Sequence, residues 1–250
     1  MLRKALFGLI ALAAFAAAAP ASAQTADEVI ARSIEARGGL ASIKAVESVR
    51  MTGTMSMGPM EMPMVVEMKR PARFRAQMTF QGSPVVQGFD GQQAWTIAPT
   101  GGGRAEALPA EAARQMAQQA DLEGALVDYK AKGHQAELVG KEQVEGRDAY
   151  RVKLTLKSGD VEFYLIDAKS WLPVRVEAVR QLGPNRIEGE TKLGDYREVA
   201  GWKWPHTIEN GAKGRPEKQT LSFTRIEVNA AIDDARFQMP AAKASDPPRQ

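Results

Sequence analysis

Residues 48–69 read SVRMTGTMSMGPMEMPMVVEMK, and the pattern of this stretch decides the fold. Apolar or small residues occupy every second position on both sides of a Gly58-Pro59 turn. A period of two places such side chains on one face of a β-strand. The stretch therefore predicts two antiparallel strands with one apolar face. The residues of that face are Val49, Met51, Gly53, Met55, Met57, Met60, Met62, Met64 and Val66.

The period of two continues along most of the chain. Residues 74–80 form a third strand of this kind, and Asp90-Gly91 indicates a hairpin turn because both residues accept a positive φ. Short connections and the lack of a βαβ pattern favour a mainly β fold, with one antiparallel, strongly curved sheet of about eleven strands. The other predicted strands span residues 85–89, 94–98, 135–143, 147–157, 161–167, 173–181, 185–198, 202–209 and 218–229.

Two segments are predicted to be helical. Thr25 to Arg37 begins with a capping box formed by Thr25 and Glu28, and Gly38-Gly39 ends it. Ala105 to Tyr129 is rich in Ala and Gln and lacks a strong apolar stripe. We therefore expect the second helix to be a lid or connector rather than part of the core.

The first residues have the pattern of a cleavable signal peptide. Arg3 and Lys4 precede an apolar run, and Ala21-Ser22-Ala23 is a small-x-small cleavage site. The run is shorter than the roughly twenty residues that span a bilayer. We expect a signal peptide at residues 1–23, a single β domain at 24–240, a disordered Pro-rich tail at 241–250 and localisation in the periplasm.

Composition narrows the classes of partner. The chain has 33 Lys and Arg against 30 Asp and Glu, and loss of Arg3 and Lys4 with the signal leaves a net charge of +1. No run concentrates basic residues, so we expect no nucleic-acid partner. The chain has no Cys, and therefore neither disulfides nor the lipid-acceptor Cys that a bacterial lipoprotein needs.

Methionine is concentrated in one place, with seven residues between Met51 and Met68. They are interpreted either as ordinary core residues or as an adaptable surface for acyl chains, because Met is flexible and polarizable. A third interpretation is that their thioethers hold Cu(I) outside the cytoplasm, although neither a Cys nor a nearby His supports a copper site. The copper hypothesis uses Met55, Met57, Met60, Met62 and Met64.

No group of residues in the sequence points to catalysis. His134 and His206 lie far apart, no G-x-S-x-G motif occurs and a Cys nucleophile is impossible. Turn chemistry accounts for Asp90, Asp160 and Asp167. We therefore expect no enzyme activity, no catalytic residue, no metal and no cofactor.

Five segments of the chain carry a family resemblance. They are GGLASIKAVESVRMTGTM (38–55), MEMPMVVEMKRPARFRAQMTFQG (60–82), GFDGQQAWTI (88–97), DLEGALVDYKAKGHQAELVGKEQVEGRDAYRVKLTLKSGD (121–160) and IEVNAAIDDARFQMP (226–240). These segments resemble the outer-membrane lipoprotein-sorting proteins, distant relatives of the LolA/LolB lipoprotein carriers. The resemblance extends over about residues 25–240 and rests on turns and strands rather than on a catalytic signature.

The resemblance implies a fold and a function. The implied fold is an unclosed antiparallel β-barrel with helices covering its open mouth, and the implied activity is carrying lipids or acylated lipoproteins across the periplasm inside a hydrophobic cavity. The membrane-anchored LolB type needs a lipidated Cys, which is missing here. The soluble type closes its lid through hydrogen bonds of an Arg, whose position this sequence does not identify.

We therefore predict a monomeric, non-catalytic periplasmic carrier or binding protein for lipid or lipoprotein acyl chains, served by transport partners in the inner or outer membrane. The alternatives are a Met-rich periplasmic copper-binding protein and a module that docks another envelope protein. A packed interior without a cavity would favour the docking module. A one-residue register error moves the residues of a strand to its other face. The residues expected to line the cavity are Met55, Met57, Met62, Met64, Phe74, Met78, Phe80 and Trp95.

Overall fold

The structure is a computed structural model that describes residues 24–182 and 185–241, so the predicted signal peptide and nearly all of the predicted tail lie outside it. In the described residues, thirteen strands form one antiparallel sheet that does not close into a barrel. The strands are β1 (Ser48–Met57), β2 (Met60–Lys69), β3 (Arg73–Phe80), β4 (Ser83–Phe89), β5 (Ala94–Ile97), β6 (Ala105–Ala107), β7 (Gln135–Val144), β8 (Arg147–Thr155), β9 (Val161–Asp167), β10 (Pro173–Leu182), β11 (Asn185–Val199), β12 (Trp202–Ala212) and β13 (Lys218–Val228).

The predicted fold class is confirmed, with thirteen strands in place of about eleven. The short strand β6 lies inside the stretch that was predicted to be helical. The helices are α1 (Ala26–Ala36), α2 (Gly39–Lys44) and α3 (Ala110–Gln119), with 3-10 turns at Pro99–Gly101 and Asp234–Arg236. No helix in the described part of the chain is long and apolar enough to cross a membrane.

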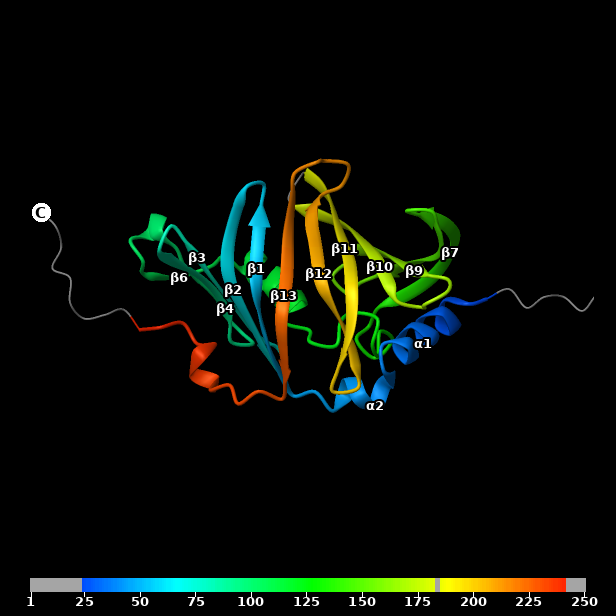
Figure 1. The fold of residues 1–250 in the computed structure, drawn as a ribbon, viewed down its shortest axis with the longest axis horizontal. Coiled ribbons are helices and arrows are strands. Elements are labelled where there is room, and N and C mark those ends of the chain that lie inside the picture. Colours follow the sequence, from blue (N-terminus) through cyan, green and yellow to red (C-terminus); the bar gives the residue numbers. More distant parts are fainter. Residues whose placement is uncertain (1–23, 183–184, 242–250) are drawn as a thin grey trace, which may run out of the picture.

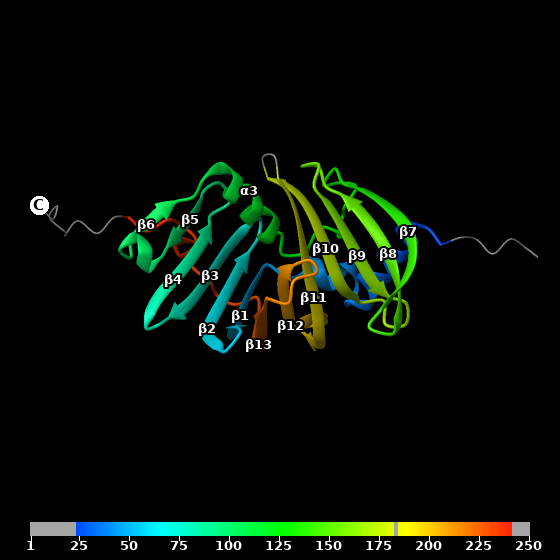
Figure 2. The ribbon, with the colours of Figure 1, turned by 90° about the horizontal axis from the view of Figure 1, so that it is seen from above.

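The order of the strands follows from one long connection, which contains α3 and joins the two edge strands β6 and β7. From β1 the chain runs hairpin by hairpin to β6 at one edge, and after α3 it enters β7 at the other edge. It then returns through successive hairpins until β13 pairs with β1, where Val49 lies opposite Val228. Figures 1 and 2 show the result as one twisted layer, with α3 above the middle of the sheet and α1 and α2 at one end of the strands.

One face of the sheet, here called the inner face, carries the apolar side chains of β1, β2 and β3. Val49 pairs with Met68, and Met68 pairs with Phe74, so these three side chains share the inner face. Met116 and Ala120 of the α3 region are buried in the same cluster. A second cluster lies where α1 and residues 120–133 pack against β8 and β9, with Val29, Leu126, Val152, Leu154 and Ile166 among its members.

The first predicted helix is confirmed. In α1 the Thr25 hydroxyl accepts a hydrogen bond from the Glu28 amide, and the Glu28 carboxylate accepts one from the Thr25 amide. The chain then turns at Gly38, which has φ of +125°. A Cβ atom there would lie 1.9 Å from the Gly201 carbonyl oxygen, so only glycine lets α2 sit against the β11–β12 turn.

The second predicted helix, Ala105 to Tyr129, is much shorter than expected. Only Ala110–Gln119 is α-helical, and residues 120–133 form a series of turns. Gly124 and Asp128 have positive φ, which interrupts a right-handed helix. The apolar residues Leu122, Leu126 and Val127 are nevertheless buried, so this segment contributes to the core without regular structure.

Candidate functional site

The methionine-rich hairpin presents its thioethers on the inner face. Met55 of β1 lies opposite Met62 of β2, and Met57 lies opposite Met60. Met64 lies opposite Met78 of β3. Because paired residues in a sheet share a face, the structure brings together seven of the eight residues that were predicted to line a cavity. These seven are Met55, Met57, Met62, Met64, Phe74, Met78 and Phe80.

Exposure changes along this methionine face. Met62 and Met64 are buried, whereas Met57 is 42% and Met60 is 40% exposed. Met64 belongs to the cluster that includes Met116 of α3. The inner face is therefore covered near α3 and open at the β1–β2 turn.

The prediction for Trp95 was wrong about its face. Gly88 pairs with Trp95, while Phe89 and its partner Ala94 share the inner face with Phe74. The Trp95 side chain thus lies on the outer face, 1% exposed, where its indole N–H donates to the Phe237 carbonyl at 2.7 Å. A Cβ at Gly88 would clash with the indole, so glycine makes room for it.

A pocket of about 480 Å³ opens on the inner side of the sheet, between α3, residues 121–134 and the β8–β9 hairpin. None of the predicted cavity residues lines it. Its apolar walls come from Ala117, Ala125 and Leu156, and its polar groups include Glu162 and Tyr164. The complete lining is Arg114, Ala117, Gln118, Asp121, Gly124, Ala125, Lys132, His134, Leu156, Ser158, Glu162 and Tyr164.

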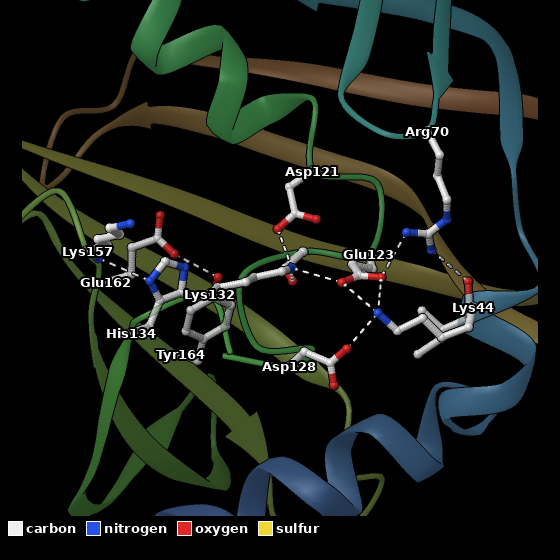
Figure 3. Close-up of polar contacts among 12 residues, drawn as sticks. Lys44, Arg70, Asp121, Glu123, Asp128, Lys132, His134, Lys157, Glu162 and Tyr164 are labelled. Carbon is white, nitrogen blue, oxygen red and sulfur yellow. Dashed lines mark hydrogen bonds and ion pairs between the residues drawn. The ribbon is translucent and has the colours of Figure 1, made fainter. Parts of the chain in front are cut away.

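Beside this pocket, Glu123 is held by three cations, as Figure 3 shows. Its carboxylate lies 2.9 Å from Lys44 Nζ, 3.0 Å from Arg70 Nη1 and 3.1 Å from Lys132 Nζ. Glu123 is only 4% exposed, whereas the side chains of its three partners are partly exposed. Lys44 belongs to α2, Arg70 to the β2–β3 turn and Lys132 to the segment that contains Glu123 itself.

The Glu123 cluster, made of Lys44, Arg70, Glu123 and Lys132, fixes the cover of the inner face. Burial by itself raises the pKa of the Glu123 carboxyl, but hydrogen bonds from the three cations outweigh burial and lower the pKa to about 2. Glu123 is therefore ionised at neutral pH. The cluster ties the irregular segment 120–133 to α2 and to the sheet.

Arg70 also bonds to backbone groups. Its Nε donates to the Val46 carbonyl at 2.8 Å and its Nη2 to the Ile43 carbonyl at 3.2 Å. The family resemblance assigned no lid-closing arginine to this chain, and these hydrogen bonds of Arg70 were not anticipated from the sequence. The sequence feature that marks this position is an Arg-Pro pair in the turn before β3.

The histidines do not assemble with other ligand side chains. His134 lines the pocket, where its Nδ1 accepts a hydrogen bond from the Lys157 amide, and burial lowers its pKa. His206 is buried, with its Nδ1 3.1 Å from the Trp204 carbonyl oxygen. In the described residues, no group of three or more His, Cys, Asp or Glu side chains is placed to hold a metal ion.

Known proteins resemble this chain in structure, whereas comparisons of its sequence find no relative. No protein-family model and no curated protein matches the sequence. Among solved structures, a DUF1329 family protein from Desulfovibrio piger matches with a TM-score of 0.59 and 9% identity, over 85% of this chain and 97% of that one.

Two further solved structures are similar to this chain. A putative outer membrane lipoprotein-sorting protein domain from Vibrio parahaemolyticus has a TM-score of 0.56 and 11% identity, over 85% of this chain and 97% of that one. A LolA superfamily protein from Nitrosomonas europaea has a TM-score of 0.55 and 13% identity, over 86% and 98%. The chain therefore has the fold of the LolA superfamily and of the lipoprotein-sorting domains.

Proposed function

We propose that this protein is a carrier or binding protein of the bacterial envelope that holds acyl chains of lipids or lipoproteins against the inner face of its sheet. The observation that carries the proposal is the continuous methionine face. It runs from the exposed Met57 and Met60 to the buried Met62 and Met64, and Met64 lies in one apolar cluster with Met116 of α3. An acyl chain entering at the β1–β2 turn meets apolar surface at every step.

The energetics favour such a ligand. Each CH₂ group that leaves water contributes about 0.8 kcal/mol, so a chain of roughly sixteen carbons gains on the order of 10 kcal/mol before ordering costs. The part of α3 that packs on the inner face is made of Ala113, Met116 and Ala117. Displacing these mostly small side chains forfeits less apolar burial than a long chain supplies.

The proposed localisation is the periplasm, because the predicted signal peptide at residues 1–23 would direct the chain there. The proposed role needs a shielded apolar surface and a movable cover, and it involves no chemical step. The fold it shares with a lipoprotein-sorting domain and a LolA superfamily protein supports the proposal. The docking module would be favoured by a packed interior without a cavity. The pocket of about 480 Å³ under the cover therefore argues against it.

Native mass spectrometry tests the proposal. Protein purified gently from a bacterial periplasm, or incubated with envelope lipid extract, should carry a lipid or acyl-chain adduct. A clean apo mass after both treatments contradicts the proposed function.

A second candidate, Cu(I) binding, is favoured by one specific arrangement. The pairs Met55–Met62 and Met57–Met60 are neighbours on one face of the same hairpin, which gathers four thioethers, ligands that suit Cu(I). Incubation with Cu(I) under the same conditions tests this candidate. A stoichiometric copper adduct without any lipid adduct favours it over the carrier.

A further inference from the structure

Glu162, which is half-buried, differs in its partners from the three buried glutamates of the described residues. Glu67 contacts Arg50, Arg75 and Arg236, and Glu177 contacts Arg151 and Lys213. Glu123 contacts three cations as described above. Glu162 lines the 480 Å³ pocket, and its side-chain partner is the Tyr164 hydroxyl, which donates to it at 2.7 Å.

No Lys or Arg of the described residues forms an ion pair with Glu162. Arg180 acts on it electrostatically without contact. Burial raises the pKa of the Glu162 carboxyl in spite of the Tyr164 bond. A half-buried carboxyl without a cation is less favourable than a paired one, and a cation delivered by a ligand would reduce the cost.

The basic groups around the pocket are engaged elsewhere. Lys132 Nζ contacts Asp121 and Glu123 and donates to the Gly124 carbonyl. Arg114 is paired with Glu111 on α3. Figure 3 shows Glu162 and Tyr164 beside His134, whose Nδ1 accepts the Lys157 amide. The pocket therefore offers Glu162 no counter-ion from its own walls.

A second acceptor without a partner belongs to Gln118, which also lines this pocket. The Gln118 side-chain amide donates through Nε2 to Asp160 at 3.2 Å, which fixes its orientation and leaves Oε1 as the free end. This Oε1 is buried and unbonded. A buried carbonyl oxygen without a donor is costly, so a hydrogen-bond donor at Gln118 and a cation at Glu162 would each lower the free energy.

The apolar part of the pocket indicates what the cation is attached to. Gly124, Ala125 and Tyr164 also line a second pocket of about 120 Å³, whose further lining includes Leu126, Leu193 and Pro205. Ala117, Ala125 and Leu156 form apolar walls near Glu162. An apolar chain lying along these surfaces places a charged end at the carboxyl.

We propose that this pocket binds the primary ammonium end of an amphiphile, with Glu162 as its counter-ion and Gln118 Oε1 as a further acceptor. The inference rests on the proposed carrier function and names the head group that it selects. An ammonium group has three N–H donors and no acceptor, which matches two acceptors in one pocket. A quaternary ammonium lacks these donors and is a poorer match.

The surroundings fit an aminophospholipid. A neighbouring pocket of about 620 Å³ shares Arg114 and Ser158 with the first and is also lined by Arg180 and Arg186. The Arg180 Nε is buried without a hydrogen-bond partner. Arg114 and Arg186 are paired with Glu111 and Glu188, so a phosphate next to the ammonium would meet chiefly the Arg180 guanidinium, a group that binds phosphate well. A free long-chain alkylamine shares the ammonium chemistry and lacks the phosphate.

The test is a competition measured by native mass spectrometry on the full mature chain. Phosphatidylethanolamine and phosphatidylglycerol with identical acyl chains are offered in mixed vesicles to wild type, to Glu162→Gln and to the control Glu137→Gln. Glu137 is an exposed β7 residue whose side chain is 68% accessible. Dodecylammonium and dodecanol form a second pair of ligands, which tests the ammonium without a phosphate.

We expect wild type and the control to prefer phosphatidylethanolamine by about tenfold or more, since hydrogen-bonded charge pairs reach this size. Glu162→Gln, which keeps the shape of the side chain, should bind both lipids equally. Dodecylammonium should exceed dodecanol with the same dependence on Glu162. Equal binding of the two phospholipids by wild type, a preference that survives Glu162→Gln, or dodecylammonium no better than dodecanol overturns the inference.

The wild-type comparison decides the matter even if Glu162→Gln does not fold. The outcomes also separate this inference from the carrier function itself. Binding of both phospholipids without preference leaves the carrier and removes the ammonium site. Binding of neither lipid removes both.

Discussion

Arg70 Nη1 lies 3.0 Å from Glu123 Oε2, and this contact joins the β2–β3 turn to the irregular segment that covers the inner face. The two residues are 53 positions apart in the chain. Glu123 is nearly fully buried and Arg70 is mostly buried, so water and salt screen the contact less than they screen an exposed ion pair. It is the point at which the cover and the sheet are held together, and its removal should loosen the cover before it unfolds the sheet.

Arg70→Met should destabilise the protein by about 1–3 kcal/mol, because Glu123 loses one of three cations and two backbone carbonyls lose their donor. Hydrogen exchange should accelerate in residues 120–133 more than in β1 and β2. Urea unfolding and hydrogen-exchange mass spectrometry measure the two effects. The control is Arg73→Met, which removes a more exposed pair with Asp234; equal exchange in both variants contradicts the role of Arg70.

Acid should weaken the cover through Glu123. Its folded pKa, about 2, lies below the ordinary value of 4.5. The stability it contributes is therefore present above about pH 4.5 and is lost as the pH falls towards 2. The shift corresponds to roughly 3 kcal/mol. Urea unfolding at pH 7, 5 and 3 should show that Glu123→Gln loses less stability with acid than wild type does. If the free energy of unfolding falls equally with pH in both proteins, Glu123 makes no such contribution.

Met57→Asp should weaken lipid binding at least about tenfold, because a carboxylate at the open end of the methionine face is costly to cover with an acyl chain. Met57 is exposed, so stability should change by less than about 0.5 kcal/mol. Ser56→Asp is the matched control, one residue away on the outer face. Fluorescent fatty-acid titration measures both variants, and equal binding by both would mean that the ligand lies elsewhere.

Replacing Met55, Met57, Met62 and Met64 by Leu separates the carrier from the copper candidate. Leu keeps the volume and apolar character of Met but has no thioether. Lipid binding should stay within about threefold of wild type, since each replacement is close to neutral in apolar area. Parallel titrations with lipid and Cu(I) measure it. Loss of lipid binding contradicts the carrier, whereas copper binding that only wild type shows supports the second candidate.

The strands could be predicted from sequence because alternation is a local property. Alternation runs along residues 48–57, 60–66 and 74–80, and the pairs Met55–Met62 and Met64–Met78 follow from a tight turn and a matching register. The Thr25 capping box was readable for the same reason. In each case, residues close together in the chain determine the structure.

Trp95 shows where this reasoning fails. Alternation says which residues share a face but not which face is inside, and here the outer face is also covered, by the segment that contains Phe237. Ala94 and Trp95 are adjacent and both buried, so apolar character could not distinguish them. The register of β4 with β5 determines which of the two side chains lies on the inner face. This register depends on the pairing of the whole sheet.

The pocket and the Glu123 cluster could not be predicted at all. Gln118, His134 and Glu162 come from three separate segments, and each is unremarkable in its own sequence context. Leu122, Leu126 and Val127 looked like a helix continuing to Tyr129, yet the positive φ of Gly124 breaks it. Such sites arise from tertiary contacts, which local patterns do not encode.

The central claim is that acyl chains lie against the inner face of the sheet, and photo-crosslinking tests it most directly. A phospholipid with a diazirine on its acyl chain is incubated with the mature protein, irradiated, and the labelled peptides are sequenced by mass spectrometry. We predict labels on inner-face residues, among them Met55, Met62 and Met78, or on Leu156 of the pocket. Labels confined to outer-face residues such as Ser56, or no labelling above that of unfolded protein, would contradict the account.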